Sequence, residues 1–228
     1  MSWTYEDLAK MIDHSLLRPM LSQAELEAGC QLARNYQVAS VCILPWALAR
    51  CAQILAGSGV AASTVIGFPH GAHATRVKVF EAEQALLDGG VELDMVVNIS
   101  QVRSGDWGYV RDDIRAVLEP THGRGAKLKV IFENCYLDDA QKIRLCEICG
   151  ELRVDWVKTS TGYGTSGATD EDLILMRRHS PAEVQVKAAG GVRDLDRLLR
   201  VRELGCTRCG ATATQAILDE AKRRLSIA

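Results

Sequence analysis

Tracts of a single charge sign are missing from this chain of 228 residues. Its 27 lysines and arginines balance 29 aspartates and glutamates, so the net charge is -2 and the sequence pI is about 6.2. Nothing in the composition therefore favours nucleic acid or a membrane surface as a partner. No apolar run approaches the roughly 20 residues of a membrane span, and Met1–Asp7 contains neither a basic segment nor an apolar one. We expect a cytosolic protein.

Linkers and low-complexity stretches are also missing. The chain is 47% hydrophobic and 25% charged, which is ordinary for a globular protein with a substantial core. Its length suits either one large α/β barrel or two small domains, and without a linker the first is favoured.

Strand and helix patterns alternate along the whole sequence. The predicted strands, short and β-branched as parallel strands covered on both faces are, are Ile12–Leu16, Ser40–Leu44, Ser63–Gly67, Glu92–Asn98, Lys127–Phe132, Val154–Thr159, Glu183–Lys187 and Cys206–Gly210. Helix-start signals between them are Ser22, Thr75, Asp138, Thr169 and Asp194. Eight β-α units predict an α/β protein, a single (β/α)8 TIM barrel domain over residues 1–228. An open doubly wound sheet is the alternative.

The eight cysteines include two C-x-x-C pairs, a spacing that can bind zinc or perform redox chemistry. Cys146 and Cys149 lie in a helical pattern, while Cys206 and Cys209 lie in a predicted strand that would point their sulfurs to opposite faces. We therefore predict no metal site. The other four read as small buried hydrophobes in a reducing cytosol: Cys30, Cys42, Cys51 and Cys135. Cys42, at a strand end, could instead be a reactive thiol.

Two lysines at predicted strand ends indicate amine chemistry. Lys158 precedes Thr-Ser-Thr-Gly, and Lys187 precedes Ala-Ala-Gly-Gly. A lysine amine attacks a carbonyl only when it is unprotonated, whereas its ordinary pKa is about 10.4. Burial and a neighbouring cation both lower that pKa, so two lysines on adjacent strands would make one of them nucleophilic. The alternative is that each lysine ends its strand and extends its amine into water.

Asp94 is a carboxylate inside an otherwise apolar strand. An inward-facing carboxylate needs a partner, and a barrel lysine would provide one. Asp94 could form a structural salt bridge, or it could relay the proton transfers that Schiff-base formation requires. The residues at or near predicted strand ends, where a barrel carries its chemistry, are Pro45, Asp94, Asn98, Glu133, Lys158, Lys187 and Gly210.

Six motifs follow one another along the chain: Asp13–Pro19, Val41–Pro45, Val65–Ala72, Glu92–Asn98, Val157–Gly167 and Val186–Val192. In this order they resemble the motifs of the deoxyribose-phosphate aldolases, a family of class I aldolases. The resemblance runs from about residue 8 to residue 215, and Lys-Thr-Ser-Thr-Gly with Val-Lys-Ala-x-Gly-Gly is its most specific part. It implies a (β/α)8 barrel and a reaction that needs no metal or other cofactor.

The resemblance also implies a role for four residues. Lys158 corresponds to the Schiff-base lysine, Lys187 to the lysine that lowers its pKa, and Asp94 to the aspartate that assists proton transfer through water. Asp13 corresponds to an acidic residue beside the second lysine. The substrates would be a sugar phosphate, 2-deoxy-D-ribose 5-phosphate, and the aldehydes D-glyceraldehyde 3-phosphate and acetaldehyde.

Two glycine loops predict a phosphate site. Gly190–Gly191 and Gly210–Ala211 precede helices on adjacent strands, so their backbone N–H groups would face one anion. Thr161–Gly162 would line the same pocket. The alternative is that these glycines only permit tight turns.

The chain departs from the family near this loop. Gly210–Thr214 reads Gly-Ala-Thr-Ala-Thr where many members have a Gly-Thr-Ser-type run, so two hydroxyls expected near the phosphate are lost or displaced. Tyr163 stands where some members supply a lysine, and Leu225–Ala228 lacks the tyrosine that some members insert from their tail. Besides deoxyribose-phosphate aldolase activity, two hypotheses stay open: a related lysine-dependent aldolase for another sugar, and a barrel that binds sugar phosphate without catalysis. The sequence leaves the oligomeric state open, and a homo-oligomer is compatible with it.

Overall fold

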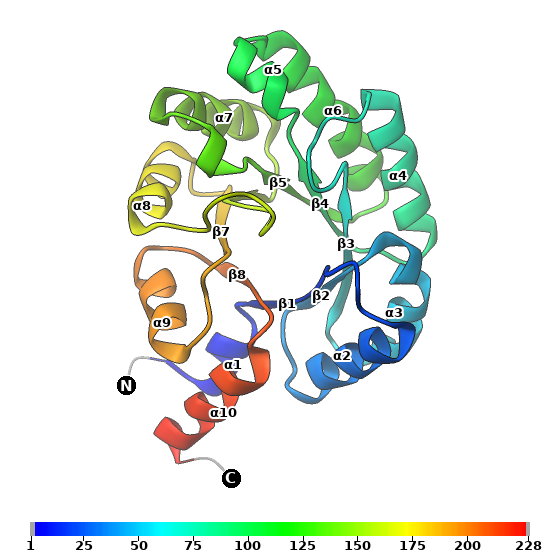
Figure 1. Ribbon diagram of the computed structural model, residues 1–228, viewed down its shortest axis with the longest axis vertical. Coiled ribbons are helices and arrows are strands. Elements are labelled where there is room, and N and C mark those ends of the chain that lie inside the picture. The colour runs from blue at the N-terminus through cyan, green and yellow to red at the C-terminus, as the bar shows by residue number, and fades with distance from the viewer. Residues whose placement is uncertain (1–2, 227–228) are drawn as a thin grey trace.

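The structure, a computed structural model, describes residues 3–226. Within that range eight parallel strands form a closed barrel, in which each strand pairs with the next and β8 pairs with β1 (Figure 1). The strands are β1 (Ile12–Leu16), β2 (Ser40–Ile43), β3 (Ala61–Ile66), β4 (Glu92–Val96), β5 (Lys127–Ile131), β6 (Trp156–Lys158), β7 (Gln185–Ala189) and β8 (Arg208–Ala211). The predicted barrel is confirmed, and the open sheet is wrong because the β1–β8 pairing leaves no free edge.

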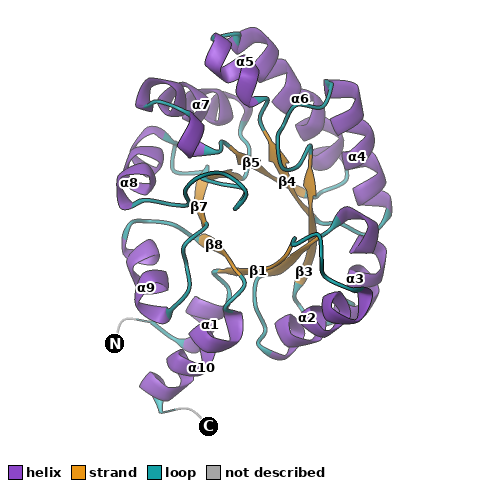
Figure 2. Ribbon diagram, viewed as in Figure 1, coloured by secondary structure: helices purple, strands orange, loops and turns teal. Residues whose placement is uncertain are grey.

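Helices form a ring outside the strands (Figure 2). They are α1 (Tyr5–Ala9), α2 (Gln23–Asn35), α3 (Leu48–Leu55), α4 (Thr75–Leu87), α5 (Ile99–Ser104), α6 (Trp107–Gly123), α7 (Asp139–Leu152), α8 (Asp170–His179), α9 (Leu195–Glu203) and α10 (Thr214–Leu225), with short 3-10 turns η1 (Pro45–Ala47) and η2 (Asn134–Tyr136). No helix among residues 3–226 is long and apolar enough to cross a membrane.

Strand boundaries lie within two residues of those predicted, and two differences matter for the site. β7 continues to Ala189 rather than ending at Lys187, because its ladder with β8 continues. Lys187 therefore lies below the strand end. β8 begins at Arg208 rather than at Cys206, because the N–H of Cys206 donates to the carbonyl of Val201 at the end of α9. The placement of this C-x-x-C pair inside one strand was wrong.

Four predicted helix caps are confirmed: the side chains of Ser22, Asp138, Thr169 and Asp194 accept from the first turns of their helices. The cap predicted at Thr75 is wrong. Ala74 is the N-cap of α4, and the Thr75 hydroxyl donates instead to Asp113 Oδ1, at 2.8 Å. A buried carboxylate on α6 thus competes successfully for this hydroxyl.

Asp113 also forms a buried ion pair outside the barrel, the Lys78–Asp113 pair. Lys78 Nζ lies 2.6 Å from Asp113 Oδ2 and donates to the carbonyl of Val96 at 3.0 Å. Both side chains are almost completely buried. The pair joins α4, α6 and the end of β4, and its single cation is balanced by a single anion.

The cysteines are all free thiols, seven of them buried and Cys135 half-buried. Cys146 and Cys149 lie on α7, as the helical pattern predicted. Burial raises the pKa of Cys146 to about 11. The residues that the structure describes hold no group of three or more histidine, cysteine or acidic side chains placed to bind one metal ion.

Candidate active site

Lys158 and Lys187 meet inside the barrel. β6 and β7 are neighbours, and their register places the two lysines opposite each other. Each Nζ lies 2.7 Å from the same oxygen, Oδ2 of Asp94 on β4. Lys158 is 3% exposed, and Lys187 and Asp94 are fully buried. The structure therefore brings together the three residues predicted to be catalytic, and the alternative of two amines extended into water is wrong.

Further charged side chains lie below this contact. Lys129 on β5 lies 2.9 Å from Asp94 Oδ1 and 2.6 Å from Glu92 Oε2. Arg208 on β8 contacts Glu92 Oε1 at 2.8 Å and Asp13 Oδ1 at 2.5 Å. Asp13 also pairs with Lys187, as expected, with 2.5 Å between Oδ2 and Nζ.

These side chains form one network, which we call the barrel cluster. Its cations are Lys129, Lys158, Lys187 and Arg208, and its carboxylates are Asp13, Glu92 and Asp94. Four cations therefore face three anions. Carrying an excess charge inside a protein is costly, so one basic group is favoured to lose its proton.

The pKa shifts identify Lys158 as that group. Burial lowers the pKa of Lys158, and the charge of Lys187 lowers it further, against the opposing effect of Asp94. Burial acts on Lys187 in the same sense, but Asp13 and Asp94 outweigh it and raise the pKa of Lys187. Lys129 behaves like Lys187, because its three carboxylate neighbours raise its pKa well above the ordinary value. Lys158 is therefore the lysine of the cluster whose pKa is lowered, and of the two causes expected from the sequence, burial contributes more than the second lysine.

Two carboxylates of the cluster, Asp94 and Asp13, have lowered pKa values. Burial opposes ionisation of Asp94, but three neighbouring lysines overcome it and hold its pKa well below the ordinary value. The pKa of Asp13 is lowered in the same way, by Lys187, Lys129 and Arg208 against the cost of burial. Asp94 is therefore placed, 2.7 Å from Lys158 Nζ, where a carboxylate could take part in proton transfer.

Cys42 lies near the cluster but is a poor nucleophile. Burial raises its pKa to about 11, and the charge of Asp94 adds to that effect. The thiolate is the reactive form of cysteine, so a protonated Cys42 disfavours the reactive thiol that its strand position suggested.

A cavity of about 470 Å³ opens above the barrel cluster at the C-terminal ends of the strands. Lys158 lines it, while Lys187 and Asp94 lie beneath. Predicted substrate-binding residues in its wall are Thr161, Gly162, Gly190, Gly191, Gly210 and Ala211. Asp13 lies in the barrel cluster below, fully buried, where it contacts Lys187 and Arg208 and does not line the cavity. Substrate binding by these seven residues stays a prediction.

The glycine loops differ from each other. Gly190 and Gly191 have φ values of +80° and +90°, a left-handed conformation that favours glycine. Within residues 3–226 their N–H groups meet no hydrogen-bond acceptor. Gly210 and Ala211 instead lie within β8. Thr212 lines the cavity, so one hydroxyl of the altered run remains there, whereas the buried Thr214 hydroxyl bonds to His14 Nδ1 at 2.8 Å.

Part of the site was not predicted from the sequence. Lys129, Glu92 and Arg208 were not singled out, although Lys127-Leu128-Lys129 and Glu92-Leu93-Asp94 place charges at every second position of apolar strands. That spacing points charged side chains to one face, and it was the available signal. Cavity-lining residues also missed are Ser15, Leu17, Arg18, Pro19, Met20, Ala189, Val192 and Arg193. Of these, Arg18 and Arg193 bring positive charge to the wall.

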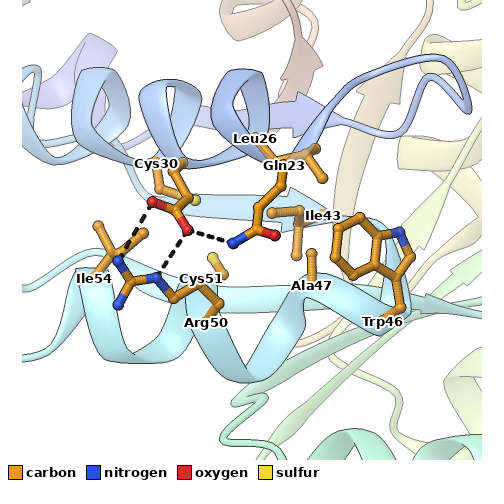
Figure 3. A pocket seen from close by; sticks show the side chains of 10 residues that line it. Gln23, Leu26, Cys30, Ile43, Trp46, Ala47, Arg50, Cys51 and Ile54 are labelled. Atoms are coloured by element: carbon orange, nitrogen blue, oxygen red, sulfur yellow. Dashed lines mark hydrogen bonds and ion pairs between the residues drawn. The ribbon is translucent and has the colours of Figure 1, made fainter.

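A second, smaller cavity of about 80 Å³ lies between α2 and α3 (Figure 3). Glu27 accepts from Gln23 Nε2 and Arg50 Nε there, each at 3.0 Å. Trp46 lies at its edge and is mostly exposed. None of the predicted site residues lines it.

The fold and the barrel cluster define a (β/α)8 protein with a buried lysine of lowered pKa in the wall of its cavity. The model of the DeoC/LacD family of aldolases matches residues 8–212. The chain is 64% identical over 225 residues to a deoxyribose-phosphate aldolase of Rhodopirellula baltica, which is 99% of this chain and 93% of that protein. The chain belongs to the DeoC/LacD aldolase family.

Solved structures agree with this assignment. A putative deoxyribose-phosphate aldolase from Coccidioides immitis is 34% identical and superimposes with a TM-score of 0.92, over 97% of this chain and 88% of that one. A deoxyribose phosphate aldolase from Aeropyrum pernix, described as a unique tetramer, is 28% identical with a TM-score of 0.89, over 96% of this chain and 92% of that one.

Proposed function

We propose that this protein cleaves 2-deoxy-D-ribose 5-phosphate reversibly to D-glyceraldehyde 3-phosphate and acetaldehyde through a Schiff base on Lys158. The observation that carries the proposal is that Lys158 alone combines a lowered pKa with a place in the wall of the 470 Å³ cavity. The other lysines of the barrel cluster have raised pKa values and lie beneath it. The family and the names of the relatives support the same reaction.

The first half of the reaction forms the imine. The neutral amine of Lys158 adds to the C1 aldehyde of the open-chain sugar, and loss of water gives the protonated imine. Asp94 Oδ2, 2.7 Å from Lys158 Nζ, accepts the proton that the amine gives up on addition. Lys187, held charged by Asp13 and Asp94, keeps this carboxylate in place and lowers the pKa of Lys158.

The second half breaks the C2–C3 bond. The hydroxyl on C3 loses its proton and becomes the aldehyde oxygen, the C2–C3 electron pair moves into the protonated imine, and D-glyceraldehyde 3-phosphate, which carries C3 to C5, leaves. The enamine that remains is protonated on carbon and hydrolysed to acetaldehyde and the free amine of Lys158. Asp94 exchanges these protons through water, because it is the carboxylate nearest the imine nitrogen.

The phosphate is held by backbone groups and by charge. Among residues 3–226 the N–H groups of Gly190 and Gly191 have no acceptor, and both glycines precede α9, whose N-terminus favours an anion. Arg18 and Arg193 line the same cavity and add positive charge in place of the lysine that some family members have at position 163. Ala211 and Thr212 complete the site from the end of β8.

Three further proposals concern context. We treat residues 1–228 as one domain, which the unbroken barrel from β1 to β8 supports. We expect a homo-oligomer, since the Aeropyrum pernix relative is described as a tetramer. The cytosolic location expected from the sequence stays a prediction. The C-terminal segment in which some members carry a tyrosine includes residues 227 and 228, which lie outside the described residues.

A substrate panel tests the function. The protein is expected to release acetaldehyde from 2-deoxy-D-ribose 5-phosphate with a kcat/KM at least tenfold above that for 2-deoxy-D-ribose, and borohydride with acetaldehyde should inactivate it. Preference for another sugar would favour the related aldolase, which the altered run after β8 keeps as second candidate. No borohydride inactivation and no turnover of any sugar would leave only a binding protein.

A further inference from the structure

Tyr163 connects three loops above the cavity. The segment between β6 and α8, residues 159–169, passes over the mouth of the barrel (Figure 1), and we call it the arch. Tyr163 of the arch lines the cavity. Its hydroxyl donates to the carbonyl of Leu17, after β1, at 2.9 Å. Its ring packs edge-on against Phe68, after β3, with 5.5 Å between ring centroids.

The start of the arch is fixed by a buried carboxylate. Glu133, at the end of β5, accepts hydrogen bonds from the N–H and the hydroxyl of Thr161. The Thr161 Oγ1 in turn accepts from the N–H of Tyr163 at 3.0 Å. Glu133 is 2% exposed and has a φ of +58°, a strained conformation for a residue other than glycine. Hydrogen bonds through Thr161 therefore connect Tyr163 to Glu133, just after β5.

Close packing fixes the rest of the arch. A Cβ at Gly164 would lie 2.6 Å from Cys135 Sγ, and one at Gly167 would lie 2.6 Å from the carbonyl of Gly190. Both positions therefore need glycine. The arch thus rests on η2 at one point and on the proposed phosphate loop at another, with Tyr163 between them.

The hydroxyl proton of Tyr163 is committed to the Leu17 carbonyl, so it is not available to donate to a phosphate. The side chain instead offers a ring held in one position. We propose that Tyr163 determines substrate specificity in the aldolase reaction: it is a fixed roof that limits how far a substrate extends from Lys158. The inference rests on the proposed function, and it adds a residue that sets the length of the accepted aldehyde.

The test compares Tyr163→Ala with the wild-type enzyme in both directions. In cleavage, KM for 2-deoxy-D-ribose 5-phosphate should rise about tenfold or more, because the ring that closes the cavity is gone. In synthesis with acetaldehyde as donor, the rate with hexanal relative to propanal should increase about fivefold or more, since the roof no longer excludes the longer chain. Tyr163→Phe keeps the ring and loses only the bond to Leu17, so its KM should rise about two- to tenfold.

Tyr136→Ala is the matched control. Tyr136 is 40% exposed, close to the 49% of Tyr163, but it does not line the cavity. Its KM and aldehyde preference should equal those of the wild type. The proposed role of Tyr163 would be contradicted if Tyr163→Ala left KM and aldehyde preference unchanged, or if Tyr136→Ala changed them equally. If Tyr163→Ala does not fold, Tyr163→Phe and Phe68→Ala decide, and an unchanged KM in both overturns it.

Different results would refute the proposed aldolase function and the proposed role of Tyr163. A wild-type enzyme that does not cleave the phosphorylated sugar refutes the proposed function. If the wild-type enzyme cleaves this sugar and the Tyr163 variants keep its KM and its aldehyde preference, only the proposed role of Tyr163 is refuted.

Discussion

Lys78 and Lys158 are both buried lysines that contact a buried aspartate, but their surroundings differ in charge. Lys78 forms an ion pair with Asp113 and donates a second hydrogen bond to the carbonyl of Val96, so one cation meets one anion. Lys158 shares Asp94 with two other lysines, in a cluster that holds four cations and three carboxylates. The first arrangement stores no excess charge, whereas the second favours loss of one proton.

Access to substrate separates the two regions as well. Lys78 is enclosed by α4, α6 and the end of β4 and lines neither of the cavities described above, whereas Lys158 forms part of the wall of the 470 Å³ cavity. Burial alone therefore does not make a lysine a nucleophile. Of these two buried lysines, Lys158 is the one that combines an unbalanced charge with a cavity at the amine, which is why we propose it as the nucleophile.

Replacing the nucleophile should give the largest effect. Lys158→Leu removes the amine that we propose forms the imine and puts an apolar group of similar bulk in its place. Cleavage of 2-deoxy-D-ribose 5-phosphate should fall by a factor on the order of 10⁴ to 10⁶, in the range seen when a covalent nucleophile is removed, while circular dichroism stays unchanged. Peptide mapping after borohydride reduction with acetaldehyde should locate the label at Lys158 in the wild type. A label at Lys187 would reverse the assignment.

The balanced pair should respond in stability and not in chemistry. Lys78→Met leaves Asp113 buried without its cation, which costs about 3–5 kcal/mol of folding free energy, or a fall in Tm of roughly 6–20 °C for a domain of this size. The pH dependence of kcat/KM should stay that of the wild type. The control is the double variant Lys78→Met/Asp113→Leu, which removes both charges and should regain much of the lost stability. A shifted pH profile in Lys78→Met would mean that the two regions are electrically coupled.

Removing a cation from the barrel cluster should shift the pH profile. Lys158 attacks as the neutral amine, so activity rises as the pH passes its pKa. Lys187→Leu removes a charge that lowers this pKa and leaves Asp94 more fully to Lys158, and both changes raise it. The rise in activity should move about one to two units toward higher pH, with a loss of about 10- to 100-fold at pH 7 that is recovered at alkaline pH.

Glu92→Gln is the opposing control, because it removes an anion from the same cluster and keeps a hydrogen-bond acceptor. The profile should then move toward lower pH, by less than about one unit, since Glu92 contacts Lys129 and Arg208 rather than Lys158. If neither variant moves the profile, burial alone sets the pKa of Lys158 and the charge count is irrelevant.

Local patterns were enough to predict the barrel and the meeting of Lys158, Lys187 and Asp94. Alternating strands and capped helices specify β-α units, and side-chain alternation in parallel strands brings inward-facing residues together. Thr75 failed as a cap because Asp113, from a distant helix, binds its hydroxyl. No local pattern reports such a contact.

The charge balance of the site was not predictable from one sequence. Lys129 and Arg208 read as ordinary strand charges until the barrel closes and places them between Asp13, Glu92 and Asp94. Whether Lys158 or a neighbour loses the proton depends on distances between side chains on six strands. The sequence predicted Lys158 as the nucleophile, which stays a prediction, and the structure adds that its pKa is lowered and that it lines the cavity.

The smallest effect should come from the mouth of the cavity, where neither buried cluster reaches. Thr212 is the hydroxyl residue of the altered run that still lines the cavity, so Thr212→Ala should remove one neutral hydrogen bond to the phosphate, worth about 0.5–1.5 kcal/mol. The phosphate is remote from the reacting carbon and is held alike in ground and transition states, so the cost should appear as a rise of about two- to tenfold in KM at unchanged kcat.

Thr165→Ala, at an exposed threonine outside the cavity, is the matched control. KM for 2-deoxy-D-ribose and the pH profile should not change in either variant, because the barrel cluster sets the pH dependence and the mouth sets phosphate affinity. An equal rise in KM for both sugars would show that Thr212 does not contact phosphate, and it would favour the aldolase for another sugar.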